Sequence, residues 1–222
     1  MKKTDKRIIF AALACCAVMA LIDGILRPGY LPKSICKIAL FFFVPYFMST
    51  KMDVVFLSLL RPRKQGVLFS VLLGLGVYAV ILGGYALISP YFDFSAIAGN
   101  LTQNAGVTKN NFLYVSLYIS FVNSLLEELF FRGFLFTNLT AHRGRTFAHL
   151  FSAILFALYH VAMMIGWFSP ALFLLVLAGL ALGGWIFNRL NEKLQTIFGS
   201  WLTHMFANFA INTIGFLLLN AP

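Results

Sequence analysis

The stretch VLFSVLLGLGVYAVILGGYALIS, residues 67–89, contains no charged side chain. About 20 consecutive apolar residues in a helix are enough to cross the hydrocarbon core of a bilayer. This stretch therefore predicts a membrane-spanning helix. The sequence on both sides of it shows whether further spans are present.

The rest of the chain repeats the same pattern. Of its 222 residues, 60% are hydrophobic and only 11% are charged, whereas soluble domains carry roughly 25% charged residues. We expect one all-α, polytopic membrane domain covering residues 1–222. The stretch 54–60 could extend the second span or lie along the membrane surface, so an eighth, broken span stays open. The other six predicted spans are 8–26, 35–50, 111–139, 147–167, 169–188 and 196–219.

The net charge of +10 reflects basic residues at the ends of the apolar runs. This placement indicates orientation in a lipid bilayer and not nucleic-acid binding. With the N-terminus in the cytoplasm, the cytoplasmic side receives Lys2, Lys3, Lys6, Arg7, Lys51, Arg61, Arg63, Lys64, Arg143, Arg145, Arg189 and Lys193. The opposite side receives Arg27, Lys33, Lys37 and Lys109. Basic residues are enriched in cytoplasmic loops, so we expect the N-terminus inside and the C-terminus outside.

Charges also occur inside the fourth predicted span, in NSLLEELFFRGFLF (123–136). A charged residue near mid-bilayer costs about 2.5–3.5 kcal/mol on insertion scales. Glu128 and Arg132 are four residues apart and can pair on one helix face. Glu127 points elsewhere and has no partner within its helix except Asn123, one turn earlier. We therefore expect Glu127 to be an unpaired acid that serves a function.

Two further spans carry isolated polar residues, His160 in the fifth and a stripe in the seventh that recurs every four residues. A rise of about 1.5 Å per residue places Glu127 roughly 15–18 Å, His160 about 20 Å and His204 about 12 Å from the cytoplasmic side. These depths fall in one band, which predicts a shared site open toward the cytoplasm. The stripe consists of Ser200, His204, Asn208 and Asn212.

Glycines cluster in 74–84 and 179–184. Gly179 and Gly183 have the G-x-x-x-G spacing that allows helices to approach closely. The alternative is that these glycines mark the broken helices of a transporter.

A carboxylate and an imidazole around one water are suited to hydrolysis. Glu127 could remove a proton from the water while His160 orients the water molecule. His204 and Asn208 could donate hydrogen bonds to the oxyanion of an attacked carbonyl. The acid and both histidines could instead hold a zinc ion with an open position for water. No H-E-x-x-H motif supports zinc, and both mechanisms remain open.

Three ordered motifs resemble the CPBP family of CAAX-type proteases and bacteriocin-processing enzymes, also called the Abi family. The first, E-E-x-x-x-R, is matched by Glu127, Glu128 and Arg132. The second, F-x-x-x-H, is matched by Phe156 and His160, and the third, H-x-x-x-N, by His204 and Asn208. The resemblance covers about residues 111–212.

The resemblance implies an intramembrane endopeptidase like the type II CAAX prenyl endopeptidases, acting on a membrane-associated peptide or protein. By analogy, Glu127 and His160 activate water, His204 and Asn208 stabilise the oxyanion, and the Glu128–Arg132 pair supports the site. The family is commonly labelled a metalloprotease, although a metal-free mechanism has been argued. The compact chain resembles prokaryotic members, which implies a prokaryotic cell membrane and a link to bacteriocin processing or immunity. Two other hypotheses remain: a transporter with a Glu/His proton relay, and a non-catalytic scaffold or immunity protein.

Overall fold

The computed structural model describes residues 3–64 and 66–220, which form helices and connecting segments without any strand. Seven helical segments in this described part are long and apolar enough to cross a membrane. The prediction of an all-α polytopic bundle is therefore confirmed. The stretch 54–60 forms no eighth span among the described residues, because it contains only the short helix η3 (Leu57–Leu60). Lys2, one of the predicted cytoplasmic charges, lies outside the described residues.

The seven spans are built from continuous or interrupted helices. The first three are α1 (Lys3–Leu21) with η1 (Ile22–Leu26), α2 (Tyr30–Ile38) with η2 (Ala39–Phe43) and α3 (Val44–Lys51), and α4 (Val67–Ile88). The fourth joins α6 (Phe112–Tyr118), η4 (Ile119–Asn123), α7 (Ser124–Glu128), η5 (Leu129–Phe136) and α8 (Thr137–Arg143). The last three are α9 (Arg145–Tyr159) with α10 (Val161–Met164), α11 (Pro170–Leu194) and α12 (Phe198–Asn220). The helix α5 (Ser95–Ala105) lies in the connection between α4 and α6.

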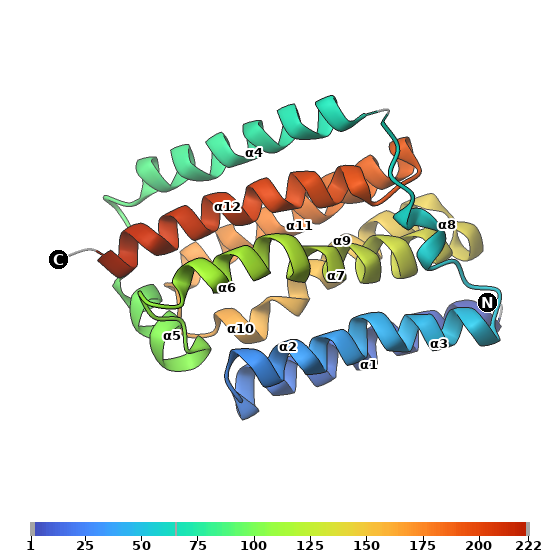
Figure 1. Ribbon diagram of the computed structural model, residues 1–222, viewed down its shortest axis with the longest axis horizontal. Coiled ribbons are helices and arrows are strands. Elements are labelled where there is room, and N and C mark those ends of the chain that lie inside the picture. The colour runs from blue at the N-terminus through green and yellow to red at the C-terminus, as the bar shows by residue number, and fades with distance from the viewer. Residues whose placement is uncertain (1–2, 65, 221–222) are drawn as a thin grey trace.

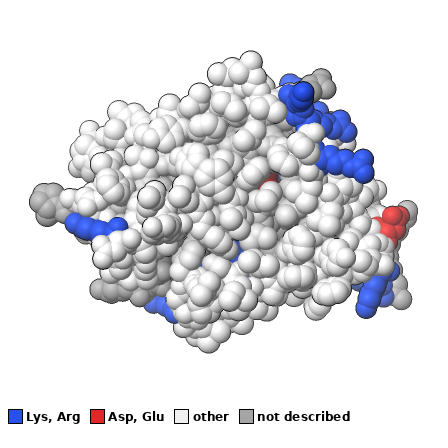
Figure 2. Space-filling view, viewed as in Figure 1, with Lys and Arg blue, Asp and Glu red and all other residues white. Residues whose placement is uncertain are grey.

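The spans run roughly along one long axis, and the beginning of α1 and the end of α12 lie at opposite ends of the bundle (Figure 1). Most Lys and Arg residues visible on the face in Figure 2 lie at its two ends, with an almost uncharged band between them. An uncharged band flanked by basic ends is the surface expected of a protein that crosses a bilayer. Which end faces the cytoplasm stays a prediction.

Close helix packing occurs at two glycines that the G-x-x-x-G spacing did not select. At Gly184 of α11, an added Cβ would lie 3.1 Å from the Cα of Ala153 in α9, and at Gly74 of α4 it would lie 2.3 Å from a ring carbon of Phe206 in α12. No atom lies within 4 Å of the corresponding position at Gly179 or Gly183. Gly74 and Gly184 belong to the two glycine-rich stretches, so the expectation that these stretches allow close packing is confirmed, whereas the G-x-x-x-G pair Gly179 and Gly183 does not form the contact.

A cluster of aromatic rings forms the interior beside the fourth span. Phe41 of η2 stacks on Phe130 of η5 with ring centroids 4.1 Å apart. Phe131 meets Phe41 edge to face and also meets Phe156 of α9. All four rings are at most 2% exposed. This packed cluster holds η2, the fourth span and α9 together where the polar side chains converge.

Candidate active site

The two glutamates lie on a short α-helical turn between two π-helical segments. η4 ends at Asn123, α7 contains Glu127 and Glu128, and η5 begins at Leu129. π-helical turns are rare and often occur at functional sites, because the wider turn redirects the side chains that follow it. Glu127 is 2% exposed and Glu128 is fully buried. Both acids therefore require partners inside the bundle.

The two carboxylate oxygens of Glu127 have different surroundings. Oε1 accepts hydrogen bonds from Lys37 Nζ at 2.5 Å and from Asn123 Nδ2 at 3.0 Å. Oε2 lies 3.9 Å from Nε2 of His160 and 3.7 Å from Nε2 of His204. One oxygen is thus held by donors, and the other faces both imidazoles.

The second nitrogen of each imidazole fixes its tautomer. His160 Nδ1 lies 2.7 Å from the carbonyl oxygen of Phe156, and His204 Nδ1 lies 2.9 Å from Glu128 Oε1. Carbonyl and carboxylate oxygens accept hydrogen bonds, so Nδ1 is the donor in both rings. In the neutral imidazoles, the lone pair of each Nε2 therefore faces Glu127 Oε2.

The distances between Oε2 and the two Nε2 atoms are too long for direct hydrogen bonds, which for nitrogen and oxygen span about 2.7–3.2 Å. A bridging water molecule is the usual reason for polar groups to face each other at slightly larger separations. The arrangement can position one water that donates one hydrogen to Glu127 Oε2 and the other to Nε2 of either imidazole.

Glu128 and Arg132 form the pair that their spacing predicted. Arg132 NH1 lies 3.1 Å from Glu128 Oε1, and both side chains are fully buried. Arg132 also donates to the carbonyl oxygen of Gly184 at 3.3 Å, and its guanidinium lies 4.3 Å from the ring centroid of Phe156. Because Glu128 also accepts from His204, this pair fixes the orientation of one imidazole.

Asn208 lies one turn from His204 on the same face of α12, as predicted. Its Nδ2 donates to the carbonyl oxygen of Ile119 in η4 at 3.2 Å. Asn212, one turn further, donates to Ser116 O and Ser120 Oγ. These bonds join α12 to the fourth span. An amide nitrogen carries two hydrogens, so the bond to Ile119 leaves one hydrogen of Asn208 for another acceptor.

Lys37 is the site residue that the sequence reasoning missed. The charge pattern predicts that it orients the second span from the outer side, but Lys37 is only 4% exposed and contacts Glu127 inside the bundle. The expectation that Glu127 is unpaired is therefore wrong. The sequence did contain a signal, since an unmatched acid inside a membrane requires a cation and Lys37 precedes the apolar run IALFFF. Sequence spacing alone could not show that α2 lies beside α7.

The donor set also bears on zinc binding. Within residues 3–64 and 66–220, no three His, Cys, Asp or Glu side chains are arranged to hold a metal ion. The ammonium of Lys37 on Glu127 Oε1 adds a positive charge next to the place where Zn²⁺ would bind. The residues as arranged do not fit a zinc site.

The segment that carries the three motifs matches a known protein family. Residues 109–210 match the family model described as Type II CAAX prenyl endopeptidase Rce1-like. This segment is similar to the Rce1-like family. The match confirms the resemblance drawn from the three motifs, and because the family is one of proteases it supports a hydrolase. Searches of curated proteins and of solved structures found no match.

The Rce1-like segment contains both glutamates, both histidines, Arg132 and Asn208. Lys37 lies outside it, on a span that precedes the segment by two helices. The polar cluster therefore combines the Rce1-like segment with one residue from the N-terminal part of the chain.

Proposed function

We propose that this protein is an intramembrane endopeptidase that hydrolyses a peptide bond in a membrane-associated peptide or protein. The observation that carries the proposal is the convergence of Glu127 Oε2 with the Nε2 atoms of His160 and His204 at 3.7–3.9 Å. The protease family of the segment 109–210 supports the same reaction class.

In the proposed reaction, a water molecule lies between Glu127 Oε2 and the two imidazoles. Glu127 accepts one water proton while the water oxygen attacks the carbonyl carbon of the peptide bond. The carbonyl oxygen becomes an oxyanion. When the C–N bond breaks, protonated Glu127 returns the proton to the amine that leaves.

The geometry supports separate roles for the remaining polar groups. Nδ1 of each ring is already a donor to Phe156 O or Glu128, so each Nε2 is an acceptor. Water has two hydrogens, so it donates one to Glu127 Oε2 and the other to Nε2 of one imidazole, which orients it. His204 can donate to the oxyanion only after its Nε2 takes up a proton. Asn208 is the better candidate for that donor, because its amide retains a second hydrogen.

The deciding experiment substitutes Glu127→Gln, which keeps the shape and removes the base. Comparison of the membrane peptidome from cells making the normal protein with cells making this variant identifies the substrate. A purified assay on that peptide then measures turnover. We expect a loss of about 100- to 10,000-fold, the usual contribution of a general base.

Glu192→Gln is the matched control, because Glu192 is partly exposed and pairs with Arg145 at the charged end of α11. It should retain normal turnover. Cleavage that persists in Glu127→Gln would refute the proposal. Proton-coupled flux without peptide products would instead support a carrier. If the function of the protein in cells is unchanged by Glu127→Gln, a scaffold would be supported.

A further inference from the structure

Lys37 is a lysine whose burial calls for a reason. It lies on α2 within the second span, only 4% of it is exposed, and η2 begins two residues later. Lysines in membrane helices usually extend toward the interface, where water solvates the ammonium. Lys37 instead directs its ammonium into the bundle, toward the fourth span.

The ammonium forms a closed set of hydrogen bonds with two residues of that span. Lys37 Nζ donates to Asn123 Oδ1 and to Glu127 Oε1, both at 2.5 Å. Asn123 Nδ2 donates to the same Oε1 at 3.0 Å. The ammonium also lies 5.0 Å from the ring centroid of Tyr159. Each of the three groups thus restrains the other two.

This arrangement determines which carboxylate oxygen is left for chemistry. Because Oε1 is bound by two donors, rotation of the Glu127 carboxylate would break both bonds. Oε2 consequently stays directed toward His160 and His204. Catalytic groups held by such contacts keep the geometry that their reaction requires.

The charges of the cluster also balance. The positive charge of Lys37 compensates the negative charge of Glu127, and the charge of Arg132 compensates that of Glu128. Two acids and two cations leave no net charge among these four side chains. Without Lys37, a buried carboxylate would be left without its counter-charge, which is unfavourable in a low-dielectric interior.

We propose that Lys37 is a positioning residue for the hydrolysis proposed above: it holds Glu127 Oε1 so that Oε2 faces both imidazoles. The inference rests on the proposed function. It places a required residue on α2, outside the Rce1-like segment at 109–210.

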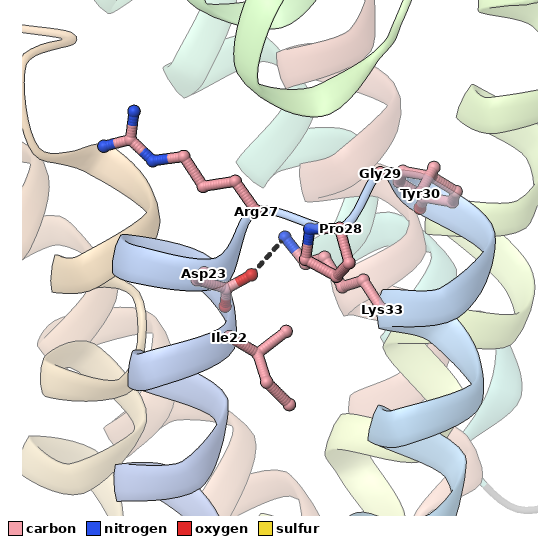
Figure 3. Close-up of a pocket in the computed structure, with 7 residues that line it drawn as sticks. All are labelled: Ile22, Asp23, Arg27, Pro28, Gly29, Tyr30 and Lys33. Atoms are coloured by element: carbon pink, nitrogen blue, oxygen red, sulfur yellow. Dashed lines mark ion pairs between the residues drawn. The ribbon is translucent and has the colours of Figure 1, made fainter.

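The chain offers a matched control one turn away on the same helix. Lys33 pairs with Asp23 at 2.5 Å, beside the turn between the first two spans (Figure 3). The side chain of Asp23 is 2% exposed, so this is also an ion pair to a buried acid. Lys33→Met removes a comparable pair without removing a hydrogen bond to Glu127.

The test measures kcat and KM of full-length Lys37→Met, Lys37→Arg and Lys33→Met on the peptide that the normal protein cleaves. For Lys37→Met we expect kcat to fall about a hundredfold, the loss typical of a misplaced catalytic group, with KM nearly unchanged. Lys37→Arg keeps the charge but not the compact ammonium, so it should fold and lose roughly tenfold in kcat. Lys33→Met should retain kcat within about twofold.

Normal or raised kcat in folded Lys37→Met would overturn the inference. If Lys37→Met does not fold, Lys37→Arg decides: normal kcat would show that any cation suffices, which refutes positioning. An equal loss of kcat in Lys33→Met would reduce Lys37 to a general structural role and also overturn it. Loss of turnover in Glu127→Gln together with normal turnover in Lys37→Met would leave the proposed function intact, so the two failures are distinguishable.

Discussion

Lys37, Glu127, Glu128 and Arg132 place four charges in the interior of the bundle. Removing one partner of a buried ion pair costs about 3–5 kcal/mol, because the other charge is left uncompensated. Each acid here has a cation within 3.1 Å. Glu128 and Arg132 stabilise the structure around His204, whereas Glu127 keeps one oxygen free of direct hydrogen bonds.

The placement of Lys37 leads to a prediction about metal dependence. A divalent cation at Glu127 would lie beside the ammonium, and the repulsion between like charges in a low-dielectric interior weakens binding. We expect cleavage to persist after exhaustive treatment with a chelator, and elemental analysis of the purified protein to show no stoichiometric zinc. Loss of activity that returns when zinc is added would contradict this expectation.

The sequence predicted the Glu128–Arg132 pair and the grouping of Glu127 with the two histidines, but it did not predict that Lys37 belongs to the site. The i, i+4 spacing predicted the Glu128–Arg132 pair, and helical depth predicted that Glu127, His160 and His204 lie near each other. Lys37 could not be placed, because the same basic residue near the end of an apolar run can orient a helix or enter the bundle. Only the packing of α2 against α7 distinguishes these outcomes.

Among the helices, the fourth span differs most from a regular α-helix. Its π-helical segments η4 and η5 lie on either side of α7. The sequence predicted the span at 111–139, and the structure has it at Phe112–Arg143. Apolar periodicity predicts where a span lies, but it does not reveal an extra residue in a turn.

The contact between α9 and α11 predicts how a substitution at Gly184 changes stability. Gly184→Ala should destabilise the protein by about 1–3 kcal/mol, as overpacking of a tight interior usually does, since the new Cβ would press on the backbone of Ala153. Thermal unfolding in detergent measures the effect. Gly183→Ala provides the control, because its Cβ would meet no atom within 4 Å. Equal stability of the two variants would show that the helices can separate at no cost.

For the whole molecule, the opposite ends of the bundle must lie on opposite sides of the membrane. The positive-inside rule assigns the end with Arg61, Arg63 and Lys64 to the cytoplasm. The number of spans and the helical class could be predicted from composition and hydropathy. The orientation depends on loop charges during insertion and remains a prediction.

Cysteine labelling checks the orientation. In a background with the three native cysteines replaced, Asp93→Cys and Arg63→Cys introduce thiols at opposite ends. Asp93 lies in the connection between α4 and α5, and Arg63 precedes α4. A membrane-impermeant maleimide added to intact cells should label Asp93→Cys strongly and Arg63→Cys only after lysis. The reverse pattern would place the N-terminus outside.

The fourth span also exceeds the lipid that surrounds it. Its 32 residues correspond to roughly 48 Å of helix, while the hydrocarbon layer is about 30 Å thick. Tilt, protrusion into the headgroups or local thickening of the bilayer must absorb the difference. The length of the lipid acyl chains therefore affects how the helix that carries both glutamates fits into the bilayer.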